Sequence, residues 1–264
     1  MPYIELRGHK VWSRQWRRWR SEPILLLHGG LSTTESFSRK VLPSLKKFRA
    51  FAYDRTAHGR TPMRKGFYHF QFQTDEAISY IEDVIKGPTH IIGHSDGGII
   101  ALMVAIQRPD LVRSIVPIGA NYHFNCGLNL DTFPVVVSEE DKDAFHERTG
   151  QPRDLWVEIV TKAHEVWKSE PQLHSRDLKK IAAPTLVVAG DDEPFANEHT
   201  VSLYESIPNS RLAIVPGTSH SVLSEKPELI KAILKDFYRD LSYPLTRNPN
   251  RRREETERIL GVNL

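Results

Sequence analysis

The sequence predicts an α/β protein with a mostly parallel sheet that carries helices on both faces. Three observations indicate this class. Short β-type runs alternate with helix-type runs along most of the chain, an order typical of parallel sheets with helical crossovers. The run from Pro23 to Leu27 is continuously apolar, as in a strand that is buried on both faces. A length of 264 residues with 39% hydrophobic and 26% charged residues suits one globular domain.

The other elements follow in chain order. One helix is predicted from the shared apolar face of residues 78, 81, 84 and 85, with Thr74 or Asp75 as its N-cap. A second helix is predicted after the glycine pair at 97–98, and a late one covers 229–241, with Ser224 as cap and Pro227 near its first turn. The further β-type runs are 50–54, 90–93, 114–118, 185–190 and 211–215.

The regular pattern breaks between about 121 and 183. Aromatic and charged residues mix there without a strand signal, and 154–168 has helical spacing. A stretch of this length is too long for a plain connection, so we predict an inserted cap over one end of the sheet. The tail at about 245–264 has mixed charge and predicts a solvated helix or a loose end. Residues 1–264 are therefore expected to form one domain with a cap and a tail.

Charge and composition exclude several partners. The net charge of +3 demands no anionic partner. The stretch 11–20 carries Trp12, Trp16 and Trp19 among arginines, a mixture found where proteins bind single-stranded nucleic acid. We favour a sheet edge with arginines over apolar rings, and expect no nucleic acid. Because Cys126 is the lone cysteine and no leader or membrane-spanning run is evident, a cytoplasmic protein without a membrane partner is expected. Oligomeric state stays open.

A five-residue motif carries the main chemical signal. Gly93-His94-Ser95-Asp96-Gly97 matches the G-x-S-x-G pattern of a nucleophile elbow. In such an elbow the serine lies on a sharp turn between a strand and a helix, and the small flanking residues let the two elements approach each other. The motif here follows the β-type run at 90–92 and precedes an apolar helical segment. We therefore predict Ser95 as a nucleophile.

A serine hydroxyl needs a base, and the base needs an acid to orient it. His220 lies shortly after the last predicted strand, where a base is expected. Three adjacent carboxylates, Asp191, Asp192 and Glu193, follow the strand before it. The chain order of serine, acid and histidine fits this type of site, but the residues alone leave the choice of acid open.

An oxyanion hole is expected beside the nucleophile. Glycines 29 and 30 follow the buried strand at 23–28, and their backbone N–H groups can point inward. We predict the N–H groups of Gly30 (Leu31 as the alternative) and of Asp96 as the two donors. His90 and His94 have a spacing that suits a metal only on a helix, and they fall on a strand and its turn. No metal and no cofactor are therefore expected.

These motifs resemble the α/β-hydrolase superfamily, in its serine-nucleophile branch. Residues 53–61 are similar to the family's D-x-R-G-x-G-x-S turn, with Ala57 and Thr61 as departures, and residues 108–112 to its link after the nucleophile helix. Gly97-Gly98 and residues 119–121 look most like the valacyclovir-hydrolase-like (biphenyl-hydrolase-like) esterases. The resemblance implies the α/β-hydrolase fold with an eight-stranded sheet. It also implies Glu193 as the acid, where aspartate is commoner.

The expected function is hydrolysis of a small carboxylic ester, in some relatives an aminoacyl ester, through an acyl-enzyme. Leu31, Asp96 and Tyr122 are the candidates for substrate binding, and the Asp96 carboxylate would favour a substrate ammonium. Ser95 argues against dehalogenases and epoxide hydrolases of this fold, which use a carboxylate nucleophile. The alternatives are a carbon–carbon bond hydrolase, a lactonase or a perhydrolase with the same side chains, or a non-catalytic binding protein.

Overall fold

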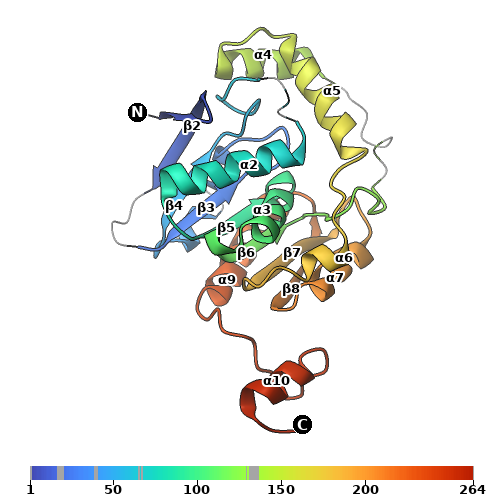
Figure 1. The fold of residues 1–264 in the computed structure, drawn as a ribbon. Coiled ribbons are helices and arrows are strands. Elements are labelled where there is room, and N and C mark those ends of the chain that lie inside the picture. Colours follow the sequence, from blue (N-terminus) through green and yellow to red (C-terminus); the bar gives the residue numbers. More distant parts are fainter. Residues whose placement is uncertain are drawn as a thin grey trace.

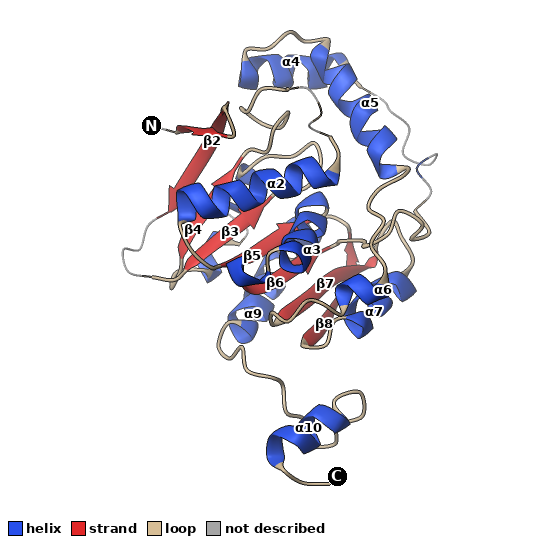
Figure 2. Ribbon diagram, in the orientation of Figure 1, coloured by secondary structure: helices blue, strands red, loops and turns tan. Residues whose placement is uncertain are grey.

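An eight-stranded sheet runs through the centre of the computed structural model (Figures 1 and 2). The order across the sheet is β1-β2-β4-β3-β5-β6-β7-β8. The strands are β1 (Tyr3–Leu6), β2 (His9–Trp16), β3 (Pro23–Leu27), β4 (Arg49–Tyr53), β5 (Thr89–His94), β6 (Val112–Ile118), β7 (Thr185–Asp192) and β8 (Ser210–Ser219). The structure describes residues 2–16, 21–38, 41–64, 66, 68–128, 130 and 137–263.

The sheet is parallel from β4 to β8, and β1 and β2 join it antiparallel. The expected mostly parallel sheet is therefore confirmed. The prediction that 11–20 forms the sheet edge is wrong, because β1 pairs with the outer side of β2 and is itself the edge strand. The predicted stacking is present, since the Arg14 guanidinium lies 5.0 Å from the Trp16 ring. Residues 17–20, with Trp19, lie outside the described residues.

Helices cover both faces of the sheet, as the sequence predicts. Alternate strand side chains face opposite ways, so Leu25 and Ile91 join one core cluster, while Leu26 and Ile92 join another. The first cluster packs under α2 and α3, and the second under α9. The helices are α1 (Glu35–Ser38), α2 (Phe70–Tyr80), α3 (Asp96–Gln107), α4 (Glu139–Thr149), α5 (Leu155–Trp167), α6 (Ser175–Leu178), α7 (Asn197–Ser206), α8 (Val222–Glu225), α9 (Pro227–Phe237) and α10 (Arg253–Leu260).

The two predicted N-caps are wrong. Helix α2 begins at Phe70, so Thr74 and Asp75 lie inside it. The Phe70 N–H donates to the Glu170 carboxylate over 2.9 Å, which caps the helix from a distant part of the chain. Ser224 lies within the separate short helix α8, and α9 begins after it with Pro227. No helix in the described part of the chain is long and apolar enough to cross a membrane.

The segment predicted as a cap carries α4, α5 and α6, and α5 covers the predicted helix at 154–168. Helix α4 lies at the top of Figure 1 and α5 at its upper right, and Phe145, Ile159 and Val166 of these helices join the first core cluster. The C-terminal end of α5 approaches the start of α3, because the Trp167 indole N–H donates to Asp96. Residues 129 and 131–136 of this segment lie outside the described residues.

The tail contains α10, which lies beyond the lower edge of the sheet in Figure 1. Arg251 anchors it. The Nη2 of Arg251 lies 2.7 Å from the Ile207 carbonyl and 3.0 Å from that of Tyr204, and its guanidinium stacks 4.3 Å over the Tyr204 ring. These carbonyls belong to the end of α7, where helix carbonyls need outside donors. The tail is therefore tied to the α7–β8 connection.

Candidate active site

The predicted reactive side chains meet at the carboxyl edge of the parallel strands. Ser95 follows β5, Glu193 follows β7 and His220 follows β8. These three strands lie on the same side of β3, and the carboxyl ends of parallel strands share one edge. That edge is where open α/β sheets bind their ligands. Residues separated by 125 positions in the chain are thus placed within hydrogen-bonding distance.

The turn at Ser95 has the backbone conformation of an elbow. Its φ of 54° and ψ of −123° are rare for a residue with a side chain, and therefore strained. A Cβ at Gly93 would collide with the backbone of Gly97, and a Cβ at Gly97 with the Leu27 carbonyl. Both glycines are required because β5, α3 and β3 approach this closely.

His220 bridges the other two side chains. Its Nε2 lies 2.9 Å from Ser95 Oγ, and its Nδ1 lies 2.6 Å from Glu193 Oε2. A carboxylate only accepts hydrogen bonds, so Nδ1 carries the proton and Nε2 accepts from the serine hydroxyl. The Glu193 side chain is fully buried and the His220 side chain is 34% exposed. His94 Nε2 also donates to the His220 carbonyl over 2.9 Å, which fixes the loop.

The three competing carboxylates have different surroundings. Strand β7 extends two residues further than predicted and includes Asp191 and Asp192. Asp191 accepts the Thr218 N–H over 3.0 Å, which joins the ends of β7 and β8. Hydrogen bonds from the backbone of Gly217 and Thr218 hold the pKa of Asp191 below its usual range. Glu193 alone of the three reaches His220, and its other oxygen accepts the Gly190 N–H over 3.1 Å.

Gly30 and Asp96, the predicted oxyanion donors, are neighbours. A Cβ at Gly30 would lie 2.7 Å from the Asp96 carboxylate and 2.5 Å from the Trp167 ring, so a larger residue does not fit. The Asp96 side chain is engaged by Trp167 Nε1 at 3.1 Å and by Arg55 Nη2 at 3.6 Å. Burial raises the pKa of Asp96, and the charge of Arg55 opposes that rise.

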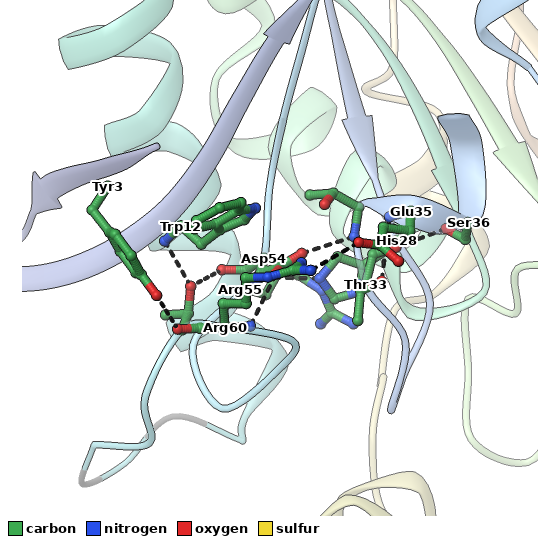
Figure 3. Close-up of polar contacts among 11 residues, drawn as sticks. Tyr3, Trp12, His28, Thr33, Glu35, Ser36, Asp54, Arg55 and Arg60 are labelled. Carbon is green, nitrogen blue, oxygen red and sulfur yellow. Dashed lines mark hydrogen bonds and ion pairs between the residues drawn. The ribbon is translucent and has the colours of Figure 1, made fainter. Parts of the chain in front are cut away.

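Arg55 and its neighbour Asp54 hold the loop that carries Gly30. Arg55 is fully buried, and its Nη2 donates to the Gly29 carbonyl over 2.8 Å. Asp54 accepts the Thr34 N–H over 2.8 Å and the Arg60 N–H over 2.9 Å (Figure 3). The turn at 53–61 thus fixes both ends of the loop after β3.

The buried ion pair leads to a stability prediction. Arg55→Met leaves the Asp96 carboxylate buried without its cation, which is expected to cost about 3–5 kcal/mol of unfolding free energy. Adding Asp96→Asn removes the unpaired charge and is expected to recover about 1–3 kcal/mol. Urea unfolding of both single variants and the double variant measures this coupling. Strictly additive losses would show that the two side chains do not stabilise each other.

A second prediction concerns acid stability. Burial, with a smaller contribution from the charge of Arg55, lowers the pKa of His58 from 6.5 to about 3. Between these values the unfolded chain binds a proton that the folded chain does not. The unfolding free energy therefore falls as the pH drops from 6.5 toward 3, by up to about 1.4 kcal/mol per pH unit for this group. Above pH 6.5 the neutral His58 makes its full contribution to stability.

His58→Gln is expected to flatten the plot of unfolding free energy against pH by about that amount per unit. Urea unfolding between pH 7 and pH 4 provides the slope, which does not depend on any constant loss of stability. His146→Gln, at an exposed position of α4, serves as the matched control. Equal slopes for the two variants would contradict the prediction.

Two cavities open beside Ser95. The larger has a volume of about 570 Å³ and its apolar wall is formed by Ile99, Leu128, Leu130, Trp167, Pro194 and Phe195. The smaller has about 200 Å³ and is lined by Ser32, Ser36, His94, Ser221, Leu223 and Ser224. Gly30, Ser95 and His220 border both cavities.

Two of the predicted binding residues do not line the larger cavity. Leu31 packs against the core cluster, and the Tyr122 hydroxyl lies 3.0 Å from the Ser202 hydroxyl. Asp96 does line it. Sequence reasoning missed His164 and Glu170, which also line this cavity. His164 lies in the predicted helix at 154–168 and Glu170 just after it, but neither belongs to a motif that would have indicated a place in the site.

Comparison with known proteins identifies the family. The model of the alpha/beta hydrolase family matches residues 24–233. The uncharacterized hydrolase YugF of Bacillus subtilis is 26% identical, over 87% of this chain and 94% of its own length. The serine hydrolase BPHL of Mus musculus is 24% identical, over 81% and 78%. A meta-cleavage product hydrolase of Pseudomonas fluorescens has the same fold, with a TM-score of 0.71 at 19% identity over 90% and 97%. This chain therefore belongs to the alpha/beta hydrolase family.

Proposed function

We propose that this hydrolase cleaves small carboxylic esters through an acyl-enzyme at Ser95. The position of His220 carries the proposal: its imidazole lies between the hydroxyl of Ser95 and the buried carboxylate of Glu193, at 2.9 and 2.6 Å. This arrangement suits a general base that removes the serine proton as the hydroxyl attacks an acyl carbonyl. A binding protein would not need this alignment.

Each remaining group has a defined part in the proposed reaction. Glu193 holds the Nδ1 proton and stabilises the imidazolium. The N–H groups of Gly30, with Leu31 as the alternative, and Asp96 stabilise the negative oxygen of the tetrahedral intermediate. His220 then gives its proton to the leaving alcohol. Water attacks the acyl-enzyme by the same route, and no cofactor takes part.

The larger cavity supports an apolar acyl group. Its wall of aliphatic and aromatic side chains gains free energy when it covers apolar surface, and it offers few hydrogen bonds to a charged substrate. The Asp96 carboxylate faces this cavity, but Arg55 already balances its charge. That pairing favours plain acyl esters over aminoacyl esters. In Asp96→Asn, the ratio of kcat/KM for aminoacyl and acyl esters should therefore stay unchanged.

A fluorophosphonate probe and a panel of p-nitrophenyl esters test the proposal. The protein should be labelled, and labelling should disappear in Ser95→Ala. Acyl chains of graded length should show a clear optimum set by the larger cavity. Absence of labelling in the folded protein would overturn the enzymatic proposal. A labelled protein that hydrolyses no ester would instead support a carbon–carbon bond hydrolase, a lactonase or a perhydrolase, which use the same side chains.

A further inference from the structure

The smaller cavity beside Ser95 differs in chemistry from the larger one. Besides Ser95, four serines line it. Ser32 lies in the loop after β3 and Ser36 in α1, while Ser221 directly precedes α8 and Ser224 lies within it. We refer to it as the serine-lined cavity. Hydroxyl groups both donate and accept hydrogen bonds. The two cavities thus present a mainly apolar wall and a wall rich in hydroxyl groups to one nucleophile.

The size of the serine-lined cavity limits its occupant. A volume of about 200 Å³ equals roughly six or seven water molecules at about 30 Å³ each. A three-carbon triol has six heavy atoms, which covalent bonds hold closer together than separate water molecules, so it fits within this volume. The Ser36 hydroxyl donates to the Thr33 carbonyl over 2.9 Å, which leaves its oxygen lone pairs available to a ligand O–H. An alkyl alcohol would displace water from these hydroxyls without replacing its hydrogen bonds, which costs affinity.

We propose that the serine-lined cavity is an alcohol subsite for a small polyhydroxy alcohol of about three carbons. The inference rests on the proposed esterase function and adds an activity to it. The alcohol that leaves during acylation occupies this cavity, next to His220. By microscopic reversibility, the same cavity admits a polyhydroxy alcohol that attacks the acyl-enzyme in place of water. The protein is therefore also an acyltransferase to small polyols.

The transfer step is balanced without any further reactant. The alcohol oxygen forms a bond to the acyl carbon, and His220 Nε2 takes the alcohol proton. The bond from the acyl carbon to Ser95 Oγ breaks, and the proton returns from His220 to the serine. The products are free enzyme and an ester of the polyol.

Product partitioning tests the subsite. The enzyme turns over a p-nitrophenyl ester in the presence of glycerol or 1-propanol at matched concentration, and mass spectrometry measures the ester and acid products. We expect at least about tenfold more ester per acid with glycerol than with 1-propanol, equivalent to about 1.4 kcal/mol. Equal partitioning to the two alcohols, or acid alone in both, would overturn the subsite while leaving the esterase proposal standing.

Two variants assign the effect to the cavity. The double variant Ser32→Ala, Ser36→Ala should lose most of the preference for glycerol over 1-propanol. Ile99→Val, in the wall of the larger cavity, should keep that preference. The ratio of products does not depend on how much enzyme is folded. A preference that survives in the serine double variant overturns the assignment, and a protein that forms no acyl-enzyme overturns both this inference and the esterase proposal.

Discussion

His220→Ala is expected to lower kcat for ester hydrolysis by about 10⁶-fold, because serine, base and acid act as one unit. In the described part of the chain, His220 is the base hydrogen-bonded to Ser95 Oγ, so its removal leaves the hydroxyl without this proton acceptor. The hydroxyl then attacks as a weak nucleophile. Steady-state and single-turnover rates with one p-nitrophenyl ester measure the loss.

A second histidine variant controls for a general loss of structure. His146→Ala, at an exposed position of α4, should keep full activity. The His220 side chain is one third exposed, so its removal should leave the circular dichroism spectrum and the urea midpoint close to those of the parent protein. A folded His220→Ala protein that retains more than about one per cent of kcat would contradict the assignment of the base.

Glu193→Gln is expected to lower kcat by about 10⁴-fold. The amide can donate to His220 Nδ1, which would hold the ring in the tautomer that carries its proton on Nε2. That tautomer cannot accept the serine proton. The amide also leaves the imidazolium that forms during attack without a negative partner. Kinetics at several pH values should show the loss across the whole range.

The neighbouring carboxylates provide matched controls for this substitution. Asp192→Asn is expected to keep activity, because its side chain is exposed and does not contact His220. Asp191→Asn should lower the melting temperature, because backbone N–H groups of Gly217 and Thr218 donate to the carboxylate and the neutral amide keeps only one acceptor oxygen. A loss of about 10⁴-fold in Asp192→Asn with an active Glu193→Gln would transfer the role of the acid to Asp192.

The parts of the site that depend on local backbone chemistry could be predicted from the sequence. The elbow at Ser95 requires small residues at fixed positions on each side, so its pattern is visible in five consecutive residues. His220 could be placed because it follows the last strand. The six parallel strands, β3 to β8, were recognisable because buried parallel strands are continuous apolar runs, whereas the antiparallel β1 has no such run.

The parts that depend on distant contacts could not be predicted. The start of α2 is capped by Glu170, one hundred residues away, and nothing near Phe70 indicates it. The choice among three adjacent carboxylates depended on how far β7 extends, which is decided by its pairing with β8. Arg55 was visible as part of a motif, but its ion pair with Asp96 joins the turn after β4 to the start of α3, and only the folded chain defines how these approach.

The anchoring of the tail by Arg251 bears on where this protein can be divided. The match to the family model ends at residue 233, inside α9, yet the donor that satisfies the last carbonyls of α7 comes from residue 251. The matched region and the part of the chain that packs as one unit therefore have different boundaries. A gene truncated at residue 233 would encode every reactive group but would lack Arg251 and its hydrogen bonds to the α7–β8 connection. That connection lies just before the strand that leads to His220.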